Sequence, residues 1–88
     1  MVKETFLVAL EPENGHICEL FDRVREELRK ASRSIISAYD YDEMRYENQG
    51  CLLITLETSR DCREKLERIL SHVKGIQHSE IMPFDGFF

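Results

Sequence analysis

The chain has 88 residues, of which 42% are hydrophobic and 33% charged, and its 17 acids and 12 bases give a formal net charge of −5. These values predict one globular domain, residues 1–88, that uses nearly every apolar face in a single core. The acidic balance argues against a nucleic-acid-binding surface, and the longest apolar run is far shorter than the roughly 18 residues that cross a membrane. The first residues also lack the charged and apolar regions of a secretory signal, so we expect a cytoplasmic protein.

Two elements are expected in the first third of the chain. Residues 5–10 read Thr-Phe-Leu-Val-Ala-Leu, an uncharged run that is typical of a central strand. Pro12 ends this strand, and Asn14 or Glu13 is the expected cap of a helix over residues 14–31. Apolar residues recur at helical spacing along that segment, as Ile17, Leu20, Phe21, Val24, Leu28 and Ala31.

The next segment is predicted to be an edge strand. Residues 35–42 are rich in β-forming residues but mixed with polar ones, as suits the margin of a sheet. Residues 42–49 show no period, and we interpret them as a hairpin loop or as frayed strand ends before Gly50.

A second central strand is predicted over residues 50–57, where Leu and Ile dominate. Thr58 then offers a hydroxyl cap with Asp61 three residues later, which predicts a helix over residues 59–74. Gly75 is a suitable left-handed stop for this helix. Residues 76–82 complete the pattern as another edge strand, with a tail after Pro83.

The order of these elements predicts an α+β domain of the ferredoxin-like βαββαβ type. Two right-handed crossovers place both helices on one face of a four-stranded antiparallel sheet ordered 4-1-3-2. The runs 5–10 and 50–57 are its adjacent central strands, and we expect these two to run parallel to each other. The face without helices is left open for a partner or a second copy.

Candidate catalytic groups are few. Asp40 and Asp42 share one face of the expected edge strand, where both should be solvated and therefore unsuited to general acid–base catalysis. No phosphate-binding loop, nucleophile elbow or H-E-x-x-H motif is present, so we expect neither an enzyme nor a cofactor.

The pattern of cysteines predicts reduced thiols within the core and no metal site. Their number is odd and they form no C-x-x-C pair, which argues against a disulfide framework. His16 and Cys18 are two apart on a helix and point in different directions, and no histidine pair has a usual zinc spacing. We therefore expect Cys18, Cys51 and Cys62 to be reduced and buried or nearly so.

Two groups of aromatic residues are candidates for partner contact. The tyrosines form either a stacking platform or a packed sheet rim, and they are Tyr39, Tyr41 and Tyr46. The C-terminal rings either cover the end of the core or insert into another molecule, and they are Phe84, Phe87 and Phe88, which flank Asp85 and Gly86.

The order of elements and several short segments are similar to a known family. The segments are residues 8–12 (Val-Ala-Leu-Glu-Pro), 52–57, 66–67 (Leu-Glu) and 79–85 (Ser-Glu-Ile-Met-Pro-Phe-Asp). Over essentially its whole length the chain resembles, as a divergent member, the guanine-nucleotide-exchange domain of translation elongation factor one beta.

The resemblance implies a non-enzymatic exchange factor for the elongation GTPase that delivers aminoacyl-tRNA, the elongation factor one alpha type, and release of its GDP. In this family a next-to-last lysine reaches the magnesium and phosphate region, and here its place falls on Gly86. Exchange would then depend on wedging by the two rings that follow. The implied partner-binding residues are Tyr46, Phe84, Asp85, Gly86, Phe87 and Phe88.

A second interpretation belongs to another class. A ferredoxin-like domain can act as an interaction or regulatory module that forms a homodimer through its open sheet face or an edge strand. RNA binding on the same fold is disfavoured by the net charge of −5.

Overall fold

The computed structural model describes residues 1–46 and 49–84 of the chain. Its elements follow the predicted order, as β1 (Val2–Pro12), α1 (Ile17–Ala31), β2 (Ala38–Tyr46), β3 (Gln49–Thr58), α2 (Cys62–Ser71) and β4 (Ile76–Pro83). The Cα atoms span 37 × 33 × 16 Å, a thickness that accommodates one sheet and one layer of helices.

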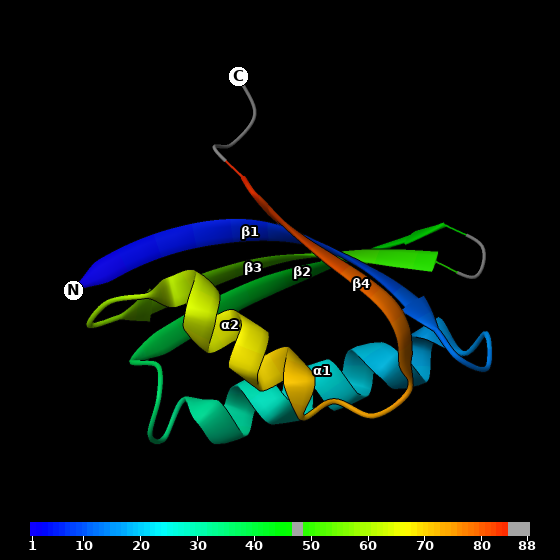
Figure 1. The fold of residues 1–88 in the computed structure, drawn as a ribbon, viewed down its shortest axis with the longest axis horizontal. Coiled ribbons are helices and arrows are strands. Elements are labelled where there is room, and N and C mark those ends of the chain that lie inside the picture. The colour runs from blue at the N-terminus through cyan, green and yellow to red at the C-terminus, as the bar shows by residue number, and fades with distance from the viewer. Residues whose placement is uncertain (47–48, 85–88) are drawn as a thin grey trace.

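The ferredoxin-like α+β prediction is confirmed. The strands form one sheet in the order β2-β3-β1-β4, which is the predicted 4-1-3-2 order read from the opposite edge. Each neighbouring pair is antiparallel, and both helices lie on one side of the sheet (Figure 1). β2 and β4 are its edges, as predicted.

The expectation that the two central strands run parallel is wrong. β1 and β3 are adjacent, as expected, but antiparallel, with Leu7 opposite Leu53 and Val8 opposite Leu52. The crossover through α1 returns β2 parallel to β1, and the hairpin between β2 and β3 then reverses the direction once.

The core lies between the sheet and the helices. Side chains alternate along β1 and β3, so that every second one is buried against α1 and α2. The predicted stripe of α1 is confirmed, and its residues are all buried. The buried apolar residues are Phe6, Val8, Leu10, Ile17, Leu20, Phe21, Val24, Leu28, Ala31, Ile36, Leu52, Ile54, Leu56, Cys62, Leu66, Ile69, Leu70 and Val73.

The predicted capping of α2 is wrong. Thr58 still belongs to β3, where it pairs with Val2, and its hydroxyl donates to the carbonyl oxygen of Ile35 at 3.0 Å. The N-cap is therefore Asp61, in the left-handed region at φ 55°, and its side chain makes no cap hydrogen bond. The helix ends at Ser71, three residues before the predicted end, although Gly75 does adopt the expected positive φ of 93°.

The start of α1 also differs from the prediction. His16 is the N-cap, while the Asn14 side chain accepts a hydrogen bond of 3.1 Å from the His16 amide, in the turn that precedes the helix. Neither helix within residues 1–46 and 49–84 is long and apolar enough to cross a membrane.

Residues 42–49 are mostly strand rather than loop. β2 continues to Tyr46 and β3 begins at Gln49, and these two residues pair. This pairing favours the strand-end interpretation over the hairpin loop. The missing apolar period did not indicate a loop, because a backbone ladder forms without one.

The prediction that all three cysteines are buried or nearly so is confirmed for Cys62 and wrong for Cys18. No disulfide joins them, as expected, and Cys62 is buried at 1% exposure. Cys51 is half-buried because its side chain lies on the side of β3 away from the helices. Cys18 is exposed because it follows Ile17 by one residue, which turns it about 100° away from the buried stripe.

Candidate functional site

The side of the sheet opposite the helices, which we call the open face, is the main uncovered surface of the fold. Residues directly opposite each other in neighbouring strands share a face, so the pairing identifies its side chains. They are Lys3, Thr5, Leu7, Ala9 and Glu11 of β1, Cys51, Leu53, Thr55 and Glu57 of β3, Ala38, Asp40, Asp42 and Met44 of β2, and His78, Glu80 and Met82 of β4.

The centre of the open face is apolar. Leu53, Leu7 and Met82 stand side by side on three neighbouring strands and are all half-buried. One row further along, Met44 lies opposite Cys51, which lies opposite Ala9. Aliphatic and sulfur side chains that meet water in a connected patch are typical of a surface that binds another molecule.

A hydroxyl pair borders this apolar centre. The side-chain oxygens of Thr5 and Thr55 are 2.8 Å apart and share a hydrogen bond across β1 and β3. Since each hydroxyl already has a partner, this row can be covered by a second protein without leaving an unsatisfied polar group.

The rim of the open face is acidic. Asp40 and Asp42 on β2 are exposed, as predicted, and so is Glu80 on β4. Lys3 lies opposite Glu57 at one end of β1, so these two opposite charges balance each other. The remaining acids therefore give the face a negative potential on both flanks.

The predicted tail site is described only at its first residue. Phe84 follows β4, is half-buried, and donates its backbone N–H to the carbonyl oxygen of Thr5 at 3.0 Å. Residues Asp85, Gly86, Phe87 and Phe88 lie outside the described residues. Tyr46, predicted in a loop, is instead the last residue of β2 by its backbone, paired with Gln49.

Tyr39 and Tyr41 are not on the open face. Both pack against the core from the helix side of β2, which favours the packed-rim interpretation for these two rings over the stacking platform. Tyr41 binds Arg25 of α1, whose guanidinium carbon is 5.3 Å from the ring centroid, and both contact the carboxylate of Glu43 at 3.0 and 2.8 Å respectively. Burial raises the pKa of the Tyr41 hydroxyl, and this cluster fastens α1 to the edge of the sheet.

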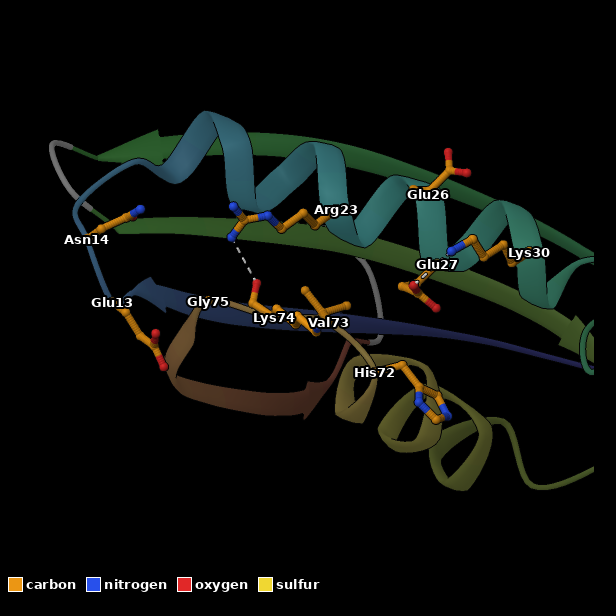
Figure 2. Close-up of a pocket in the computed structure, with 10 residues that line it drawn as sticks. All are labelled: Glu13, Asn14, Arg23, Glu26, Glu27, Lys30, His72, Val73, Lys74 and Gly75. Atoms are coloured by element: carbon orange, nitrogen blue, oxygen red, sulfur yellow. Dashed lines mark hydrogen bonds and ion pairs between the residues drawn. The ribbon is translucent and has the colours of Figure 1, made fainter.

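An open groove of about 580 Å3 lies on the opposite side of the molecule, between α1 and the turn from α2 to β4. Figure 2 shows Arg23 reaching across it to donate to the carbonyl oxygen of Lys74 at 3.1 Å. Lys30 pairs with Glu27 at 3.4 Å along the same helix. The groove is lined by both acidic and basic side chains, and this mixture of signs selects no ligand.

The described part of the chain offers no metal centre. Within residues 1–46 and 49–84, no group of three or more His, Cys, Asp or Glu side chains could hold a metal ion.

The open face was predicted as a place for partners, but its residues were not identified from the sequence. The signal was present in the two central runs, because a strand of continuous apolar residues puts half of them on each side of the sheet. With two helices on one side, Leu7 and Leu53 had to face away from the core.

No family model and no curated protein matches the sequence. Solved structures do match. One is the P2 domain of the chemotaxis kinase CheA from Thermotoga maritima, in complex with the response regulator CheY. Its identity is 18% and its TM-score 0.62, and the match covers 94% of this chain and 100% of that chain. A de novo designed protein with ferredoxin fold has 14% identity and TM-score 0.57 over 96% of this chain and 84% of that chain. A putative antibiotic biosynthesis monooxygenase from Bacteroides thetaiotaomicron has 8% identity and TM-score 0.54 over 98% and 90%. At these identities the similarities show the ferredoxin-like fold alone.

Proposed function

We propose that this domain is a non-enzymatic protein-interaction module whose open face binds a partner protein. The observation that carries the proposal is the row of Leu53, Leu7 and Met82, apolar side chains of three neighbouring strands on the side that neither α1 nor α2 covers. Removing such a surface from water is a main source of affinity between proteins.

Charge indicates the kind of partner. Asp40 and Asp42 flank the apolar row at β2, and Glu11 and Glu80 flank it at β1 and β4. A second copy of the domain would bring these acids against like charges, which is unfavourable, whereas a surface with an apolar centre and a Lys- and Arg-rich rim would complement them. The proposed partner is therefore a basic protein surface, and homodimer formation is the competing outcome of the test.

The fold is compatible with this role. The CheA P2 domain, which has the same fold, is solved in complex with the protein CheY. A ferredoxin-like domain can therefore serve as a docking unit.

The test places a photo-crosslinking amino acid at Leu53 in the full chain. The matched control carries it at Glu64, which lies on the exposed side of α2. Irradiation in the source lysate should give a protein adduct from position 53 that position 64 does not give. The crosslinked segment, identified by mass spectrometry, should be flanked by Lys and Arg.

A second variant tests the apolar row itself. Leu7→Lys puts a positive charge at the centre of the open face, so it should abolish the adduct from position 53 while the melting temperature of the domain shows that it still folds. Equal adducts from both positions would overturn the proposal. Adducts of the chain with itself would replace it with the dimer.

Nucleotide exchange on the GTPase that delivers aminoacyl-tRNA is a second candidate. It is favoured by the position of Phe84, whose N–H binds the carbonyl oxygen of Thr5, two residues before Leu7 of the apolar row, and so places the end of β4 beside that row. If the tail acts as the resemblance implies, the intact chain should accelerate release of a fluorescent GDP analogue from the GTPase.

Deletion of residues 85–88 separates the alternatives. The ladder between β1 and β4 reaches Phe84, so we expect the deletion to cost less than about 1 kcal/mol and to shift the melting temperature by only a few degrees. Exchange should nevertheless be largely lost. A domain that gives no exchange when intact is not an exchange factor, and a large loss of stability on deletion would show that the tail supports the core instead.

A further inference from the structure

A small hollow opens in the sheet above Ala9. It has a volume of about 270 Å3 and is lined by Ala9, Leu10, Glu11, Gly50, Cys51, His78 and Glu80. The small side chain of Ala9, a single methyl group opposite Cys51 and Glu80, explains it, and Gly50, opposite Leu10, contributes only backbone to the lining. On the helix side of the sheet, the ring of Phe21 occupies the place that a Gly50 side chain would take.

Two carboxylates border this hollow from neighbouring strands. Glu80 of β4 lies directly opposite Ala9, and Glu11 lies opposite His78. Among the described residues, neither Glu11 nor Glu80 forms an ion pair, whereas Glu26, Glu27 and Glu67 of the helices are all paired. The hollow therefore holds negative charge that no described residue neutralises in an ion pair.

The size and charge of the hollow limit what can occupy it. Pockets for cofactors and drug-sized molecules begin at about 300 Å3, so this hollow suits a single side chain better. Two carboxylates at the rim disfavour a carboxylate or phosphate. No group of described side chains here could hold a metal ion.

The walls favour a long basic side chain. Lys and Arg bury their aliphatic stems against apolar surface while their charged heads stay at a polar rim. Ala9 and Cys51 supply such a surface in the middle of the sheet, and Met44 lies opposite Cys51 in the same row. Anchors of this kind, with Arg prominent, dominate the binding energy of many interfaces.

We propose that this hollow is the anchor site for one Lys or Arg side chain of the partner protein. The stem lies over Ala9 and Cys51, and the cationic head is held between Glu11 and Glu80. This inference rests on the proposed function and goes beyond it by naming the residue class that the partner must present and the place that receives it.

The first test uses N-acetylarginine amide as a probe, with the neutral N-acetylcitrulline amide as its matched control. In amide-resolved NMR titrations the arginine compound should shift the resonances of Ala9, Glu11, Cys51 and Glu80 and saturate in the millimolar range, as one side chain allows. The citrulline compound should shift them at least about tenfold less. Equal shifts from both compounds, or shifts spread over the whole surface, would overturn the inference.

Variants of the chain supply the second test. Glu11→Gln with Glu80→Gln keeps the shape of the hollow and should weaken arginine binding at least about tenfold, because the charge-assisted hydrogen bonds are lost. Ala9→Met should fill the hollow and abolish binding. Glu64→Gln, on the exposed side of α2 and off the open face, should leave binding within about twofold, since it removes one carboxylate without touching the hollow.

The two proposals can fail separately. If the adduct from position 53 persists in the Glu11→Gln, Glu80→Gln variant at full yield, the open face binds its partner but the hollow is not the anchor, and the inference is wrong. If the adduct is absent in the unmodified chain while the arginine probe still binds with the predicted pattern, the hollow is a cation-selective site and the interaction module is wrong.

Discussion

The ring of Phe21 occupies the place that a side chain of Gly50 would take. A Cβ at Gly50 would overlap the end of this ring and would also come within 2.8 Å of Ile17 Cγ1. We expect Gly50→Ala to lower the free energy of unfolding by about 1–3 kcal/mol, because overpacking a well-filled core forces side chains out of their rotamers. Urea unfolding followed by circular dichroism measures this cost.

A double variant identifies the cause. Phe21→Leu removes the overlapping ring end, so adding it to Gly50→Ala should cost less than the sum of the two single variants by at least about 0.5 kcal/mol. Additive costs would mean that the glycine is needed for its backbone and that the packing explanation is wrong. Gly15→Ala is the reference variant. Its φ is 77° and an added Cβ would meet nothing within 4 Å, so its loss of unfolding free energy measures the backbone cost alone.

A buried hydroxyl fixes the turn between β3 and α2. Thr58 is 1% exposed, donates to the carbonyl oxygen of Ile35 at 3.0 Å and accepts from Lys65 Nζ at 2.7 Å. We expect Thr58→Val to lower the free energy of unfolding by about 1–2 kcal/mol, because both partners lose a hydrogen bond while the shape is kept.

Ser59→Ala is the control for this change. Ser59 also accepts from Lys65, at 3.2 Å, but it is exposed, so its loss should cost no more than about 0.5 kcal/mol. If the two variants cost the same, the burial of Thr58 does not determine its contribution. Both values come from the same urea series.

Much of the fold could be predicted from the sequence because it depends on the spacing of apolar residues along the chain. The buried stripe of α1 and the two uncharged central strands leave one compact solution for four strands and two helices. The start of α2 could not be predicted, because the Thr58 hydroxyl donates a hydrogen bond to the carbonyl oxygen of Ile35 instead of capping the helix. That choice depends on a loop more than twenty residues away in the chain, which no local motif encodes.

The candidate site was less accessible to sequence reasoning. The aromatic tail is visible as a run of neighbouring residues, whereas Leu7, Leu53 and Met82 become one surface only through strand register. The hollow likewise depends on Ala9 and Glu80 lying opposite each other, although they are far apart in the chain. Register is set by the buried face and by the hairpin, so it becomes known only with the pairing itself.

The thiols should differ strongly in their reaction rates. We expect a thiol reagent to label Cys18 first and Cys51 more slowly, because these are exposed and half-buried, and Cys62 only as fast as the domain unfolds. Mass spectrometry of a quenched time course assigns each label. Labelling of Cys62 in native protein at the rate of Cys18 would contradict its placement in the core.

The same buried thiol should make the domain sensitive to alkaline pH. Burial, and then the nearby charge of Glu4, raise the pKa of Cys62, whose sulfur lies 3.6 Å from the carbonyl oxygen of Val2 and 3.8 Å from that of Leu56. Above the unfolded pKa of about 8.5, the unfolded chain releases a proton that the native thiol keeps. Stability is therefore full below that pH and falls as pH rises through the higher native pKa.

Because burial also raises the pKa of Tyr41, the contribution of each group must be measured with its own variant. Urea midpoints measured from about pH 7 to pH 10 should fall less steeply in Cys62→Ala than in the unmodified chain, and less steeply in Tyr41→Phe at the upper end of that range. A Cys62→Ala variant with an unchanged slope would show that this thiol is not the group that titrates.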